Sequence, residues 1–337
     1  MHGPIPEFTP HALLTSGHAQ TLAGAFWNGA IGSYRACQHV ITLPDGDRVL
    51  LHDDAPPGWQ SPQRATLLIH GLGGSYASPY VSRIAAKLNA RGVRTFRLDM
   101  RGCGAGWKLA EHPGHAGRSE DVAAALDTIA RVCPGSPITA VGFSLGGNLL
   151  LKLLGEVGDR FPTGLDSALA IAPPIDLTFC SRNIERRERS FYNQAFVRSL
   201  MKQVRLRRRL VPAIAKIPMY PHPRTQFEFD DRFTAPLSGF ANAEEYYARS
   251  SAAPLLPQIQ LPTRIITAAD DPLVPREIFA SVQLSASTQL VVTKHGGHLG
   301  YIGATSADPD RRWLDWRVVD WVMLAESRHA QSLRNAA

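Results

Sequence analysis

The chain has 337 residues, of which 44% are hydrophobic and 19% are charged. Such a composition is typical of a globular protein and excludes a disordered chain. No apolar stretch reaches the roughly 18 residues that a membrane-spanning helix requires. The length predicts one large domain with an insertion.

Positive charge is concentrated in a single segment. The chain carries a net charge of +7, and residues 182–209 contain ten Lys or Arg and two Glu, which amounts to +8 and leaves −1 for the rest. Such a segment can contact an anionic membrane surface, or it can be the solvated face of a helix. No nucleic-acid-binding motif accompanies it, so we expect no nucleic-acid partner.

The four cysteines are scattered and form no Cys-x-x-Cys pair, so neither a zinc ribbon nor a disulfide framework is indicated. The first residues also lack the basic and apolar regions of a secretory signal peptide. We therefore expect a cytoplasmic protein.

Short apolar runs alternate with longer segments of helical character. The first two strands are expected at residues 37–43 and 48–53, around an Asp45-Gly46 pair that is a strong hairpin signal. Six further strands are expected at residues 65–70, 93–98, 137–141, 167–172, 263–268 and 289–293. Helices are expected at residues 80–90, 119–132, 145–156, 275–284 and 311–326. This alternation predicts an α/β fold with a mostly parallel central sheet covered by helices on both faces.

The alternation stops between residues 176 and 262, a stretch with no strand pattern that is too long and too apolar for a structureless loop. We predict that residues 176–262 form a mostly helical cap. The core would then consist of residues 1–175 and 263–337, with residues 1–34 as an N-terminal extension packed on it.

One motif supplies a candidate nucleophile. Gly142-Phe143-Ser144-Leu145-Gly146 follows an expected strand and precedes an expected helix, which is the context of a nucleophile elbow. The small neighbours permit a tight turn that lifts the hydroxyl group above the sheet. We predict that Ser144 is the nucleophile; the alternative is a serine without a role in a glycine-rich turn.

A serine hydroxyl needs an imidazole base held by a carboxylate, and in this kind of fold the chain order is Ser, acid, His. His298 lies between glycines in the loop after the last strand, so we predict that it is the base. His295, nearer the strand end, is expected to be structural. Asp271, after the preceding strand, is the preferred acid, and Asp270 is the alternative.

Two backbone N–H groups are expected to form an oxyanion hole. One belongs to Leu145, after the nucleophile, and the other to Leu72, in the glycine-rich loop after the first central strand. His70, which precedes this loop, is expected to fix its shape. No metal-binding motif is present, so we predict neither a metal nor a cofactor.

Together these motifs resemble the YheT-like branch of the α/β-hydrolases, which also contains ABHD1/ABHD3-type and EMB8-like proteins of eukaryotes. Further elements of the resemblance cover nearly the whole chain: Phe8-Thr9-Pro10, Gly17-His18-Ala19-Gln20-Thr21, Arg101-Gly102-Cys103-Gly104, Phe229-Asp230-Asp231, Thr234-Ala235-Pro236, Gly239-Phe240 and Tyr246-Tyr247. The resemblance implies an α/β-hydrolase fold and a serine hydrolase that cleaves carboxylic esters with short-to-medium or lipid-like acyl groups. Its triad would be Ser144, Asp271 and His298.

Substrate binding is expected to involve the aromatic residues Phe143, Phe179 and Tyr192. Two alternatives to ester hydrolysis stay open: an acyltransferase that uses the same acyl-enzyme, and a non-catalytic binding protein of the same fold.

Overall fold

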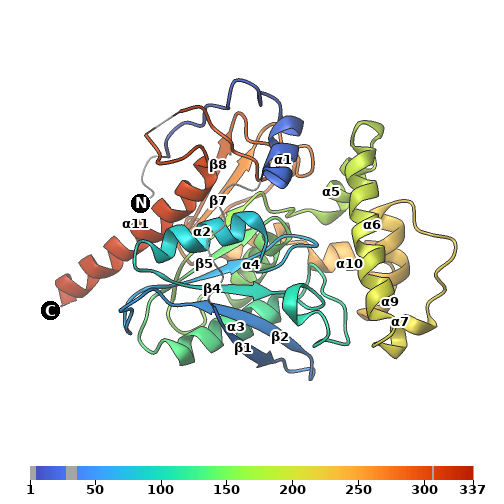
Figure 1. Ribbon diagram of the computed structural model, residues 1–337, viewed down its shortest axis with the longest axis horizontal. Helices are drawn as coiled ribbons and strands as arrows, with labels where there is room; N and C mark the ends of the chain where they lie inside the picture. The colour runs from blue at the N-terminus through green and yellow to red at the C-terminus, as the bar shows by residue number, and fades with distance from the viewer. Residues whose placement is uncertain (1–4, 28–35, 306, 337) are drawn as a thin grey trace.

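An eight-stranded sheet forms the centre of the molecule (Figure 1). The computed structural model describes residues 5–27, 36–305 and 307–336. The strand order is β1-β2-β4-β3-β5-β6-β7-β8. The pairs β1–β2 and β2–β4 are antiparallel, and the other neighbouring strands are parallel. The strands span Cys37–Thr42 (β1), Arg48–Asp54 (β2), Ala65–Ile69 (β3), Arg94–Asp99 (β4), Ile138–Phe143 (β5), Leu165–Ile171 (β6), Thr263–Ala268 (β7) and Thr288–Thr293 (β8).

Helices bury both faces of this sheet. Alternate residues of a strand point to opposite faces, so Leu67 and Ile69 of β3 join one apolar cluster and Leu68 joins another. The first cluster includes residues of α3 and α4, and the second includes residues of α2 and α11. These helices span Pro79–Asn89 (α2), Ser119–Val132 (α3), Leu145–Val157 (α4) and Trp313–Ala336 (α11). Burial on both faces explains the continuous apolar strands, and each buried Leu or Ile contributes roughly 1.5–3 kcal/mol of transfer free energy.

The parallel strands end at one edge of the sheet, where the loops that follow them converge. Ser144 directly follows β5, Asp270 and Asp271 follow β7, and His298 follows β8. Helix α1 (Gly17–Phe26) lies close to the loop after β8, as Figure 1 shows. Residues far apart in the sequence therefore meet at this edge.

The segment between β6 and β7 is described throughout and forms only helices and turns. We call residues 176–262 the cap; that it is a separate insertion unit stays a prediction. Figure 1 shows α6, α7 and α9 beside the sheet. The elements are α5 (Leu177–Ile184), η2 (Arg187–Arg189), α6 (Ser190–Arg207), α7 (Pro212–Lys216), α8 (Gln226–Phe229), η3 (Asp230–Thr234), α9 (Ala235–Leu237), α10 (Ala243–Ser250) and η4 (Ala253–Gln258).

The prediction of a helix at residues 275–284 is wrong, because only the short 3-10 helix η5 (Arg276–Phe279) forms there. Ile278 and Phe279 are buried, whereas residues 280–284 are exposed or half-buried. Another 3-10 helix, η1 (Gly104–Gly106), follows β4. In the described part of the chain, no helix is both long and apolar enough to cross a membrane.

Candidate active site

Ser144 occupies a strained turn between β5 and α4. Its φ of 51° and ψ of −119° lie in a region that residues with a side chain rarely adopt. The two glycines of the motif make this turn possible. A Cβ atom on Gly142 would lie 2.4 Å from the carbonyl oxygen of Gly146, and one on Gly146 would lie 2.5 Å from that of His70. The turn therefore excludes larger residues at both positions.

His298 and Asp271 complete a hydrogen-bonded line that begins at Ser144. The Oγ atom of Ser144 lies 3.0 Å from Nε2 of His298, and Nδ1 of His298 lies 2.9 Å from Oδ2 of Asp271. The other oxygen of Asp271 accepts the backbone N–H groups of Leu273 and Val274, at 2.8 and 3.0 Å. The Asp271 side chain is fully buried. This geometry allows His298 to take the hydroxyl proton of Ser144 while Asp271 orients the imidazole ring.

The neighbouring residues Asp270 and His295 form a second pair outside this line. Nδ1 of His295 lies 3.2 Å from Oδ2 of Asp270, and the N–H group of Gly297 donates to Oδ1 at 2.9 Å. Asp270 therefore holds the loop that carries His298 and does not contact His298 itself. Of the two carboxylates that the sequence leaves open, the structure brings Asp271 to the imidazole.

Helix α1 fixes the same loop from the other side, a role that the sequence did not indicate. The hydroxyl of Thr21 accepts the N–H group of His298 at 2.9 Å and donates to the carbonyl of Gly17 at 2.7 Å. The side chain of Gln20 bonds both the N–H and the carbonyl group of Ile302. The Gly17-His18-Ala19-Gln20-Thr21 element of the resemblance was the available signal, but its spacing alone names no partner.

The two expected oxyanion donors lie beside Ser144. Leu72, Leu145 and Ser144 line the same cavity, and among the described residues neither backbone N–H group donates a hydrogen bond. His70 supports the loop before Leu72: its Nδ1 lies 2.7 Å from the carbonyl oxygen of Gly71, and its Nε2 accepts the N–H of Met100 at 3.2 Å. Burial lowers the pKa of His70, so the ring is neutral with its proton on Nδ1. His70 thus holds the loop and takes no part as a base.

Two cavities meet at Ser144 and His298. The inner cavity, about 100 Å³, lies between the sheet edge and the cap. The outer cavity, about 410 Å³, lies between α1, the loop after β3 and helix α6. Its wall includes Leu22, Phe26 and Phe191, which are also exposed to solvent. The outer cavity therefore opens to the surface through an apolar rim.

The three aromatic residues expected to bind substrate have different positions. Tyr192 lines the outer cavity, where its hydroxyl lies 3.1 Å from Nδ1 of His18. The prediction that Phe143 binds substrate is wrong. Its side chain points into the core and packs against Tyr80, because alternate residues of β5 face opposite sides of the sheet. The same prediction for Phe179 is also wrong, since this residue is 39% exposed and lines neither cavity beside Ser144.

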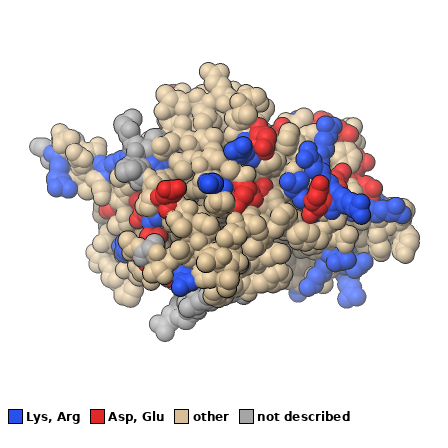
Figure 2. Space-filling model, turned by 90° about the horizontal axis from the view of Figure 1, so that it is seen from above, with Lys and Arg blue, Asp and Glu red and all other residues tan. Residues whose placement is uncertain are grey.

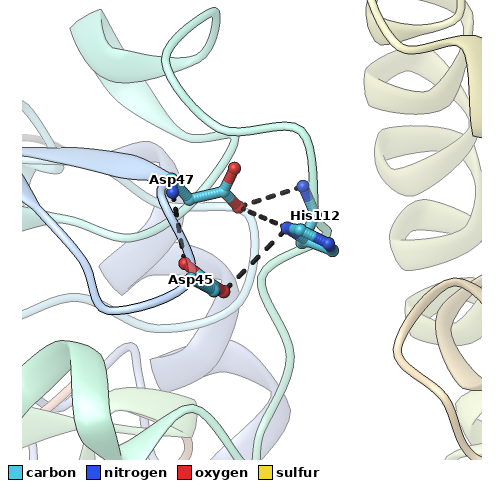
Figure 3. Close-up of side chains that lie close together, drawn as sticks. All are labelled: Asp45, Asp47 and His112. Carbon is cyan, nitrogen blue, oxygen red and sulfur yellow. Dashed lines mark hydrogen bonds and ion pairs between the residues drawn. The ribbon is translucent and has the colours of Figure 1, made fainter.

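A cluster of Asp45, Asp47 and His112 has the composition of a metal site (Figure 3). The guanidinium group of Arg101, however, donates to Asp45 at 2.5 Å and to Asp47 at 2.7 Å. Asp47 also accepts the backbone N–H groups of Glu111 and His112. A cation would have to displace Arg101, so these residues fit an ion-paired link between the β1–β2 turn and the loop after β4 rather than a metal site.

Comparison with known proteins agrees with this architecture. A model of the alpha/beta hydrolase family matches residues 66–316. One relative, YheT of Escherichia coli (strain K12), is named as an esterase. It is 32% identical over 94% of this chain and 93% of its own length. The embryogenesis-associated protein EMB8 of Picea glauca is 26% identical over 93% of this chain and 71% of its own. Phospholipase ABHD3 of Homo sapiens is 25% identical over 89% and 75%, respectively.

Among solved structures, Est1E from Butyrivibrio proteoclasticus superposes with a TM-score of 0.53 and 14% identity. The match covers 86% of this chain and 99% of that chain, and it supports the same fold.

Proposed function

This chain belongs to the α/β-hydrolase family, in the YheT-like branch, and is a carboxylic ester hydrolase; we propose that it works through Ser144, His298 and Asp271. One observation carries the proposal. The Ser144 hydroxyl, the His298 imidazole and the buried Asp271 carboxylate form one hydrogen-bonded line with contacts of 3.0 and 2.9 Å. A binding protein has no use for a nucleophile held in a strained turn beside a base and an acid.

The proposed reaction passes through an acyl-enzyme. His298 takes the proton of Ser144 as the Oγ atom attacks the ester carbonyl carbon, and the N–H groups of Leu72 and Leu145 bind the resulting oxyanion. The carbon–oxygen bond to the alcohol then breaks, and the alcohol leaves with the proton from His298. A water molecule repeats these steps with the acyl-enzyme and releases the carboxylic acid.

We propose esters with a short-to-medium or lipid-like acyl group as substrates. The apolar wall of the outer cavity suits a hydrocarbon chain, and its rim of Leu22, Phe26 and Phe191 lies exposed at the surface. The relative from Homo sapiens is named a phospholipase, which supports an ester of this class.

We further propose that the cap contacts anionic lipid headgroups through its basic residues. Figure 2 shows Lys and Arg side chains gathered over the cap. Arg207 is an exception within residues 182–209, because it is buried and donates to the carbonyl groups of Ala110, Glu111 and His112. The exposed basic side chains of the segment are Arg182, Arg186, Arg187, Arg198, Lys202, Arg205 and Arg209.

Sedimentation with vesicles tests this contact. We expect binding to vesicles that contain phosphatidylglycerol, little binding to pure phosphatidylcholine vesicles, and weaker binding at high salt. The variant with Arg186→Gln, Arg187→Gln and Arg205→Gln should lose this binding. Equal binding of the variant and the wild type would contradict the proposal.

A chain-length panel of p-nitrophenyl esters tests the reaction itself. We expect Ser144→Ala to lower kcat/KM by roughly 10⁴-fold or more, whereas Ser199→Ala, at an exposed serine of α6, should keep the wild-type rate. Hydrolysis that persists in Ser144→Ala would overturn the proposal. Product analysis with added butanol separates the two reactions of an acyl-enzyme, because a transferase would form mainly the butyl ester and a hydrolase mainly the free acid.

A further inference from the structure

The inner cavity combines two kinds of wall. Ser144 and His298 line it from the core, and Leu177, Ile184 and Phe196 of the cap give it an apolar side. The cap also contributes polar groups to the same cavity, from Ser181, Gln226, Asp230, Thr234 and Tyr247. A cavity for a plain hydrocarbon chain would not need this polar wall.

Asp230 is the charged member of that wall. It is only 5% exposed, and its carboxylate accepts the hydroxyl groups of Thr234 at 2.6 Å and Tyr247 at 2.7 Å. The Tyr247 hydroxyl also lies 3.3 Å from Oγ of Ser181. These contacts fix the direction of the carboxylate beside the cavity.

In the part of the chain that the structure describes, no cationic side chain balances this buried carboxylate. Within the described residues, Asp230 forms no ion pair with a Lys, Arg or His side chain. His115, in the same cavity, is uncharged, because burial lowers its pKa to about 3. Burial raises the pKa of Asp230 to about 6, against the opposing hydrogen bonds of Thr234, Tyr247 and Gln226. A buried charge without a counter-ion is destabilising, so a role in the fold alone does not explain this residue.

The backbone at Asp230 is also unusual. Residues Asp230–Thr234 form a π-helical turn, η3, between the short helices α8 and α9. π-Helical turns are rare and occur frequently at functional sites. The turn supplies both Asp230 and its hydrogen-bond donor Thr234 to the cavity wall.

We propose that Asp230 is a specificity-determining residue that accepts a hydrogen bond from a hydroxyl or ammonium group on one arm of the ester. A carboxylate has about four acceptor positions, so the hydroxyl groups of Thr234 and Tyr247 and the side chain of Gln226 leave capacity for one ligand donor. This inference rests on the proposed ester hydrolysis and narrows its substrate. The short arm enters the inner cavity and carries the donor, while the longer, apolar arm lies in the larger outer cavity.

Two matched pairs of esters test this inference. The first is butyl octanoate and 3-hydroxypropyl octanoate, and the second is octyl butanoate and octyl 3-hydroxypropanoate. Within each pair a methyl group is replaced by a hydroxyl group of similar size. The pair that shows the preference identifies the arm in the inner cavity. A further ester, that of octanoic acid with 3-(dimethylammonio)propanol, carries a positively charged N–H donor. Its rate shows whether the inner cavity prefers an ammonium group or a hydroxyl group as the donor.

In wild-type protein we expect kcat/KM to favour the donor-bearing ester by roughly tenfold or more in one pair, because a hydrogen bond to a charged group is strong. Asp230→Asn, which keeps the size of the side chain, should lower that ratio by roughly tenfold. Asp231→Asn removes the neighbouring exposed carboxylate and should keep the wild-type ratio. Tyr247→Phe, which removes a donor that orients the Asp230 carboxylate, should also lower the ratio.

Equal rates within both pairs together with no preference for the ammonium ester, no measurable rate on any donor-bearing ester, or a wild-type ratio in Asp230→Asn would overturn the role of Asp230. Failure of the underlying hydrolysis would appear differently. In that case wild-type protein would not cleave p-nitrophenyl butyrate, or Ser144→Ala would cleave it as fast.

Discussion

Two buried carboxylates near the same cavity, Asp271 and Asp230, differ in the groups that bind them. Asp271, at the sheet edge, has all its partners in the chain, since two backbone N–H groups bind one oxygen and His298 contacts the other. Asp230, in the cap, accepts hydrogen bonds from two hydroxyl groups and from the side chain of Gln226, and it has no cationic partner among the described residues. The core carboxylate completes a hydrogen-bonded line with His298 and Ser144, whereas the cap carboxylate keeps an acceptor available at the cavity wall.

In the mechanism proposed above, the core supplies the chemistry and the cap supplies the specificity. In the core, the loops that carry Asp271 and His298 are held by hydrogen bonds in which one partner is a backbone group. The cap presents side chains whose partners are other side chains. We therefore expect substitutions in the core to alter the rate on all esters, and those at the cap wall to alter the choice between esters.

The largest expected effect separates the neighbouring carboxylates Asp271 and Asp270. Asp271→Asn should lower kcat/KM by about 10⁴-fold, because the imidazole of His298 loses the acceptor that orients it and stabilises its charge. Asp270→Asn should lower it by less than roughly tenfold, since only the loop contacts of His295 and Gly297 weaken. Kinetics on p-nitrophenyl butyrate measure both variants. Similar losses in the two variants would break the assignment of the acid.

A smaller effect tests whether α1 belongs to the catalytic region. Thr21→Val removes the acceptor of the His298 N–H group at nearly constant volume, and a lost hydrogen bond of this kind is worth about 1–2 kcal/mol. We expect kcat/KM to fall roughly 5- to 30-fold.

Ser16→Ala is the matched control for Thr21→Val. It removes the N-cap of the same helix, where Ser16 accepts the N–H group of Ala19, and leaves the contact with His298 in place. Its effect should be on thermal stability. An equal loss of activity in both variants would mean that α1 acts only through its own stability.

The smallest effect concerns stability and sharpens the contrast at Asp230. The pKa of this carboxyl group is raised by burial from 3.8 to about 6. Because the folded chain favours the protonated form, Asp230 lowers stability progressively as the pH rises from about 4 to about 6. Asp230→Asn removes this effect, so its unfolding free energy relative to wild type should increase by about 1 kcal/mol between pH 5 and pH 7.5.

Urea unfolding at the two pH values measures that change. Asp231→Asn is the control, because it removes the adjacent exposed carboxylate. The account of Asp230 would be contradicted if the unfolding free energy of Asp231→Asn relative to wild type rose by the same amount between the two pH values. It would also be contradicted if that of Asp230→Asn relative to wild type fell as the pH rises.

The sequence predicted the sheet well, and it named candidate reacting residues that lie together in the structure, for identifiable physical reasons. Buried parallel strands are continuous apolar runs, and each expected strand has a counterpart from β1 to β8. The elbow glycines are required by contacts as close as 2.4 Å, so their spacing around Ser144 is visible in the sequence. Chain order then narrowed the search to His298 and to the pair of carboxylates after β7.

What the sequence could not predict depends on side-chain direction and on contacts between distant segments. Phe143 adjoins Ser144 in sequence, yet it faces the opposite side of the sheet and packs in the core. The bond between Thr21 and His298 joins residues separated by most of the chain. Asp230 was visible as part of a motif, but only the structure shows it buried in a cavity wall next to Ser144.

The most direct test of the central claim is labelling of folded protein with a fluorophosphonate, followed by intact mass and peptide mapping. Ser144, with His298 at 3.0 Å, should form one covalent adduct per chain, and Ser144→Ala should form none under the same conditions. Folded wild-type protein that stays unlabelled, or an adduct of equal yield in Ser144→Ala, would contradict Ser144 as the nucleophile.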